Sequence, residues 1–90
     1  MPFMKRLLKT HAFNIAETQF EIRVVENDAK IRARVFHKGE PAYQFSFIGV
    51  TRDVPIDSAA HLQIEAIASI IEETEKLARK YAGFMQNDRF

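Results

Sequence analysis

The sequence predicts an α+β fold, in which an antiparallel β-meander of three or four strands precedes one long C-terminal helix packed on one sheet face. Two observations carry this prediction. Before residue 50, apolar and polar residues alternate in several short segments, as they do in half-buried strands. After Ser58 the apolar period becomes close to 3.6 and continues to Tyr81, as it does in an amphipathic helix.

Length and composition place these elements in a single domain, residues 1–90. A chain of this length builds one core, and its 47% apolar and 28% charged composition is ordinary for a globular protein. The longest apolar run near the N-terminus is Leu7-Leu8, far short of the roughly 7–15 residues of a signal-peptide core. A cytoplasmic protein with no membrane partner is therefore expected. The absence of cysteine excludes disulfides and cysteine-based metal sites.

The sheet is expected over residues 19–50. Alternating patterns predict its strands at residues 19–26, 30–38 and 43–50. Short links between consecutive strands favour antiparallel neighbours. Residues 1–18 have the weakest pattern and are expected to be irregular, with a short extended stretch at residues 11–16 as the candidate fourth strand.

A turn at Asn27-Asp28 sets a trial register for the first hairpin. This register places Ile22 opposite Ala33 and Arg23 opposite Arg32, so that two like charges become neighbours. In the third predicted strand, alternation puts three aromatic residues on the core face rather than on a surface that could stack bases: Tyr43, Phe45 and Phe47.

The helix is expected over residues 57–82, with residues 83–90 as a flexible tail. Asp57 or Ser58 can cap its first turn, and Gly83 suits its end. Its apolar residues form two stripes. The first is expected to pack on the sheet, and comprises Ala60, Ile64, Ile67, Ile71, Ala78 and Ala82.

The second helical stripe is a candidate dimer interface. Such a helix is about 36 Å long at 1.5 Å per residue, whereas a seven-residue strand spans only about 23 Å. One sheet face therefore cannot shelter both stripes, and the second needs either residues 1–18 or a second copy of the chain as its partner. A homodimer is expected through Leu62, Ala66, Ile70 and Leu77.

The net charge of +1 conceals a segregation of charge along the chain. Residues 1–38 hold eight basic and four acidic side chains, whereas residues 39–75 hold one basic and seven acidic ones. Alternation collects five cations on the outer sheet face, against one carboxylate, Glu21. Such a face is a candidate for binding an anion or a nucleic acid, and its cations are Arg23, Lys30, Arg32, Arg34 and Lys38.

No pattern in the sequence indicates an enzyme. No two of His11, His37 and His61 have a zinc-binding spacing, and the glycines lie too far apart to form a phosphate loop. No catalytic, cofactor-binding or metal-binding residue is assigned, and no cofactor is expected. The sequence therefore favours a small non-enzymatic protein-interaction module that acts as a homodimer. The alternative is a nucleic-acid-binding regulator that uses the basic sheet face.

Overall fold

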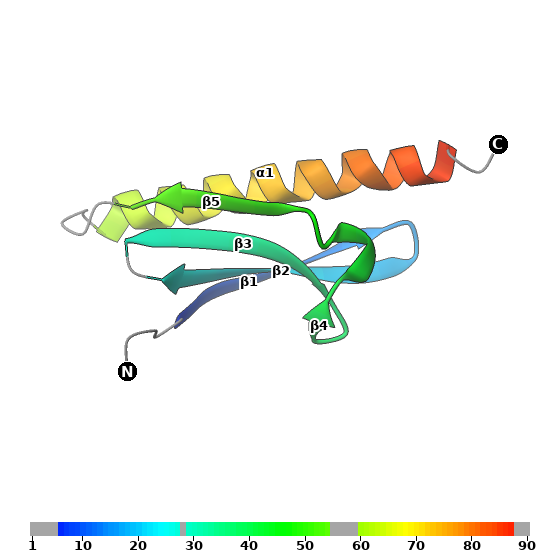
Figure 1. The fold of residues 1–90 in the computed structure, drawn as a ribbon. Coiled ribbons are helices and arrows are strands. Elements are labelled where there is room, and N and C mark those ends of the chain that lie inside the picture. Colours follow the sequence, from blue (N-terminus) through cyan, green and yellow to red (C-terminus); the bar gives the residue numbers. More distant parts are fainter. Residues whose placement is uncertain (1–5, 28, 55–59, 88–90) are drawn as a thin grey trace.

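The computed structural model describes residues 6–27, 29–54 and 60–87, and it confirms the predicted α+β fold. An antiparallel sheet forms one layer, and a single C-terminal helix lies along one of its faces (Figure 1). The elements are β1 (Arg6–Ile15), β2 (Thr18–Asn27), β3 (Lys30–His37), β4 (Glu40–Pro41), a 3₁₀ turn (Tyr43–Phe45), β5 (Gly49–Asp53) and α1 (Ala60–Asn87). The predicted helix cap at Asp57 or Ser58 lies outside the described residues.

Two-residue links connect β1 to β2, β2 to β3 and β3 to β4. In the last of these, Lys38 and Gly39 have φ values of 53° and 83°. A positive φ at both central residues matches the type I′ turn, whose twist suits a hairpin. In the first turn Ala16 has a φ of 56°, although its side chain disfavours this conformation. The hairpin pairing on both sides of the turn therefore holds Ala16 there.

The N-terminal segment is more regular than the sequence predicted. The candidate fourth strand at residues 11–16 is present but longer: β1 is a ten-residue strand at the sheet edge that begins at Arg6, where an irregular segment was expected. It pairs with β2 along its length, and a register shift between Leu7 and Lys9 interrupts the alternation. Leu8 packs against the core at this irregularity. A bulge shifts the phase of a period-two pattern, so alternation along the sequence does not indicate the full length of this strand.

The predicted strand at residues 43–50 was wrong in its position. Both β4 and β5 pair with β3, and residues 42–48 leave the sheet between them. Within this excursion the buried side chains are Ala42, Phe45 and Ile48. Their spacing of three is that of a 3₁₀ helix rather than that of a strand. Tyr43 is consequently 86% exposed instead of lying in the core, and Phe47 is exposed as well.

The register of the first hairpin also differs from the prediction. Asn27 pairs with Lys30, so the turn is centred one residue later than expected. This places Ile22 opposite Val35 and Arg23 opposite Arg34. Each partner changes by two positions, and a shift of two keeps every side chain on its predicted face.

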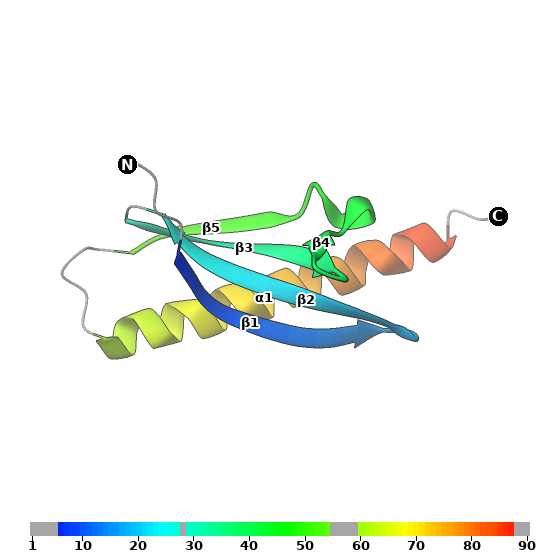
Figure 2. The same ribbon diagram turned by 90° about the horizontal axis from the view of Figure 1, so that it is seen from below.

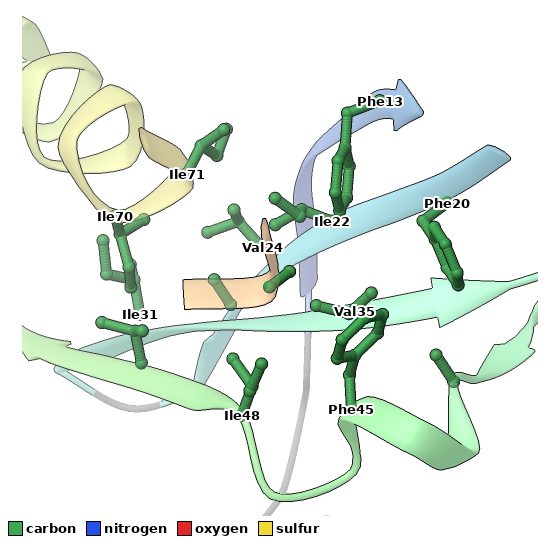
Figure 3. Close-up of a cluster of buried hydrophobic side chains, with 14 residues drawn as sticks. Phe13, Phe20, Ile22, Val24, Ile31, Val35, Phe45, Ile48, Ile70 and Ile71 are labelled. Atoms are coloured by element: carbon green, nitrogen blue, oxygen red, sulfur yellow. The ribbon is translucent and has the colours of Figure 1, made fainter. Parts of the chain in front are cut away.

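The core lies between the inner face of the sheet and α1 (Figure 3). The alternating residues of β2 and β3 point into it as predicted, and the excursion closes one end. The buried side chains are Phe13, Phe20, Ile22, Val24, Ile31, Ala33, Val35, Ala42, Phe45, Ile48, Val50, Ile70, Ile71 and Ala78. Helix α1 contacts β1, β2, β3 and β5, so it spans the width of the sheet.

The helix packs most of its predicted stripe on the sheet and adds Ile70 from the other stripe. Ile71 and Ala78 are buried, and Ile67 and Ala82 pack against the core. Ile64 is 66% exposed, whereas Ile70 is fully buried. Thr74 lies at the centre of the covered face, with its hydroxyl donating to the Ile70 carbonyl oxygen at 2.7 Å. This bond satisfies the hydroxyl within the helix, so a polar residue is accommodated in the core.

The helix also continues past its predicted end near Gly83. It runs to Asn87, so the expected tail over residues 83–90 begins as helix. A glycine within a helix costs about 1 kcal/mol relative to alanine, which is too little to end the helix by itself.

Candidate functional site

The outer face of the sheet is the side that α1 does not cover. Figure 1 shows the helix along the opposite face, and Figure 2 shows the uncovered strands from below. Within the part of the chain that the structure describes, no helix or strand crosses this outer face. Alternation along β2, β3 and β5 therefore determines which side chains this face offers to a partner.

The cations predicted for a binding site gather on this face. The register places Arg23 of β2 directly opposite Arg34 of β3. Arg32 and Lys30 follow at alternate positions along β3, about 6.7 Å apart per step. The structure therefore brings together four of the five predicted cations, whereas Lys38 lies beyond them in the turn between β3 and β4.

Arg32 and Arg34 form the centre of this cluster. A methyl group on Gly49 would lie 3.5 Å from Arg32 Nη2, so the Arg32 guanidinium lies over Gly49. Gly49 is also the register partner of Arg34. The Arg32 side chain therefore leans towards the strand position opposite Arg34.

Nearby carboxylates neutralise only part of the cluster. Arg23 Nη2 lies 3.1 Å from Glu21 Oε1, and Lys30 is the register partner of Asp53. Among the described residues no carboxylate forms an ion pair with Arg32 or Arg34. The centre of the outer face thus keeps an excess of positive charge.

Apolar groups accompany these cations. The guanidinium carbon of Arg23 lies 4.5 Å from the centroid of the Phe36 ring, a cation–π distance. Phe36 and Val25 are both half-buried, so part of each side chain reaches the surface. The face consequently combines unneutralised charge with a partly exposed aromatic ring.

A hollow of about 790 Å³ adjoins the cluster at the end of β2. Arg23 and Lys38 lie in its wall, but so do Glu17 and Glu21. These opposite charges balance, so the hollow is less suited to an anion than the open face beside it.

The predicted dimer interface on the helix is only partly at the surface. Ile70 is fully buried in the chain's own core, which corrects its assignment to a dimer surface. Ala66 and Leu77 pack against the same core and are partly buried. The side chain of Leu62 lies outside the described residues. The sheet covers the helix between the two predicted stripes, and so the second stripe is not left as a separate apolar surface.

Two polar clasps hold the helix to the sheet, and most of their contacts cannot be inferred from sequence spacing. On the β1 side, His11 Nε2 and Glu75 Oε1 lie 3.0 Å apart, and Arg79 donates to Glu75 Oε2. On the β5 side, Arg52 donates to Ser69 Oγ at 2.9 Å and to Glu73. The Glu75–Arg79 pair has helical i,i+4 spacing, whereas the other contacts join residues far apart in sequence.

The clasp at Glu75 predicts a loss of stability in acid. Hydrogen bonding to Arg79 lowers the pKa of the Glu75 carboxyl below its ordinary value of 4.5; partial burial opposes this effect, and His11 adds to the lowering. The unfolded chain therefore takes up this proton first as the pH falls. The stabilising contribution is complete above about pH 4.5 and is lost as the pH falls through the folded-state pKa.

Urea unfolding between about pH 6 and pH 3 measures this loss. Glu75→Gln is expected to lower stability near neutral pH and to flatten its dependence on pH. Glu72→Gln is the matched control, because Glu72 is exposed and forms no ion pair among the described residues. An equal flattening by both variants would contradict the assignment to Glu75.

No metal site is present among the described residues, since no three side chains of His, Cys, Asp or Glu come together. No helix in the described part of the chain combines the length and apolar character that crossing a bilayer requires.

Comparisons with protein-family models, with curated proteins and with solved structures gave no match. The residues of the outer face therefore provide the basis for inferring a function.

Proposed function

We propose that this chain is a small non-enzymatic binding module that holds a nucleic acid on the outer face of its sheet. The observation that carries the proposal is the pair Arg32 and Arg34, which lies beside Arg23 without a described carboxylate partner. Arg23 and Arg34 are directly opposite each other on neighbouring strands. Like charges in such positions destabilise a sheet by a few tenths to about 1 kcal/mol. A bound anion would relieve this repulsion.

The chemistry of the face favours a polyanion over a second copy of the same face. Two outer faces brought together would place both arginine clusters against each other, which costs free energy. A phosphate backbone instead offers a regular series of negative charges, and its binding releases condensed counterions. A cytoplasmic location, where nucleic acids are accessible, accords with this proposal.

The proposal predicts binding that weakens steeply with salt. Fluorescence anisotropy with labelled single-stranded and duplex oligonucleotides measures affinity as a function of salt concentration. Arg32→Gln/Arg34→Gln removes two phosphate contacts and retains most of each side chain's length. We expect it to flatten the slope of log affinity against log salt by about 1.4 on a single strand or about 1.8 on duplex.

Lys76→Gln/Lys80→Gln is the matched control. It removes the same charge from exposed positions on the helix, away from the outer face. We expect the slope of this variant to remain that of the unmodified protein. If neither oligonucleotide binds at low salt, or if both double variants change the slope equally, the outer face is not a nucleic-acid site.

A homodimer formed along the edge of the sheet is the second candidate. Strand β1 is ten residues long and occupies an edge, and none of the described strands pairs with its other side. Leu7 on this strand is 55% exposed. An unpaired edge of this length is a template for pairing with a second chain, although its bulge and the charge of Lys9 weaken that tendency.

Pairing along β1 predicts a thermal midpoint that rises with protein concentration. Sedimentation velocity from about 1 µM to about 1 mM, the range of weak association, should then show a shift from monomer to dimer. A monomer throughout that range, with a constant thermal midpoint, would exclude the dimer and leave the nucleic-acid proposal unaffected.

A further inference from the structure

The shape of the outer face discriminates between kinds of nucleic acid. Strands in a sheet lie about 4.8 Å apart, so the four-strand stretch from β1 to β5 is about 14 Å wide between its outermost strands, before any side chains are added. The major groove of B-DNA is about 12 Å wide and admits a helix or a two-stranded ribbon. A face this broad cannot enter the groove, and it would touch a duplex only along a narrow line of contact.

A single strand can instead lie along the face. The alternate residues Phe36, Arg34, Arg32 and Lys30 form a row about 20 Å long on β3. The row has an aromatic ring at one end and three cations along the rest. Single strands are bound by this combination, because cations follow the backbone while aromatic rings and guanidinium planes stack on unpaired bases.

The end of the row at Phe36 offers the platform for a base. Arg23 lies across the ring at 4.5 Å, and its partner Glu21 holds it at 3.1 Å. A guanidinium supported in this way presents a flat cationic surface directly beside Arg34. Half-burial of Phe36 anchors the ring, which lowers the entropic cost of ordering it for a ligand.

We infer that the ligand of the outer face is a single-stranded nucleic acid, bound along β3 with its phosphates on Lys30, Arg32 and Arg34 and with a base stacked at Arg23 and Phe36. This inference rests on the proposed function and specifies its ligand. The arginines supply most of the charge attraction, and the aromatic end supplies the preference for unpaired bases.

The test compares three probes on the full chain. They are a labelled oligothymidylate of about 16 nucleotides, at the upper end of known site sizes, the same strand paired with its complement, and inorganic polyphosphate, which has charge but no bases. The single strand is expected to bind at least about tenfold more tightly than the duplex. Phe36→Leu is expected to weaken single-strand binding by about 5- to 150-fold, the effect of losing one stacked base. Its polyphosphate affinity should not change.

Three controls distinguish the loss of base stacking from a loss of folding. Phe36→Tyr retains an aromatic ring and should restore single-strand affinity. Tyr43→Leu removes an aromatic residue that lies outside the sheet and should have no effect. An unchanged thermal midpoint for Phe36→Leu excludes unfolding as the cause of weaker binding.

Duplex binding as tight as single-strand binding would overturn this inference and leave the proposed function standing. A Phe36→Leu variant that binds the single strand normally, or that weakens polyphosphate binding equally, would also overturn it. Binding to neither oligonucleotide would remove the proposed function and this inference together.

Discussion

Truncation of Ile70 to alanine is expected to lower the free energy of unfolding by about 2–5 kcal/mol, because the side chain is fully buried and leaves a cavity when it is shortened. Ile70 packs from α1 against the inner face of the sheet, beside Ile71 (Figure 3). The loss is a large share of the 5–15 kcal/mol typical of a native protein. Urea unfolding monitored by circular dichroism measures it.

Ile64→Ala supplies the matched control for this prediction. The same two residue types are exchanged on the same helix, but Ile64 is 66% exposed. Surface changes usually alter stability by no more than about 0.5 kcal/mol. Equal losses at both positions would show that the helix presents a different face to the sheet.

Truncation of Phe20 to alanine is expected to cost about 3–5 kcal/mol, the usual range for a buried aromatic residue. Its ring centroid lies 5.9 Å from that of Phe13, 5.3 Å from that of Phe45 and 5.2 Å from that of His37. Phe20 therefore joins β1, the end of β3 and the 3₁₀ turn. Its loss should unfold the chain at a lower urea concentration and detach the excursion at residues 42–48 from the core.

Hydrogen exchange tests the local part of this second prediction. The Ile48 amide donates to the Phe45 carbonyl oxygen. In Phe20→Leu, the protection of this amide from hydrogen exchange should fall by more than the loss of global stability alone would cause. Tyr43→Ala is the control, since its side chain points away from the core and is 86% exposed. If this control loses as much stability as Phe20→Ala does, the aromatic cluster does not anchor the excursion.

The faces of β2 and β3 could be predicted from the sequence, even though their register could not. Ile22, Val24 and Val35 are buried as alternation predicted, because a side chain's face depends only on its parity along the strand. The register depends on where the turn closes, and it closed one residue later than the sequence indicated. The shift was even, so the arginines remained on the outer face.

The excursion shows why local patterns can be ambiguous. Phe45 belongs both to the alternating series with Tyr43 and Phe47 and to the period-three series with Ala42 and Ile48. A short segment cannot distinguish these periods by itself. In the period-three arrangement Phe45 packs against Phe20. This contact joins residues far apart in sequence, so the local pattern does not reveal it.

The sequence by itself determined the α+β architecture, the inner and outer faces of the central hairpin, and the cations that share its outer face. These properties follow from periodicity, which each segment carries alone. Only the tertiary structure decided that β1 extends over ten residues, that residues 42–48 leave the sheet, and that Ile70 rather than Ile64 lies in the core. The physical reason is that the apolar part of the helix is wider than the strip that one sheet face can cover, so the residues that become buried depend on the position of the whole sheet.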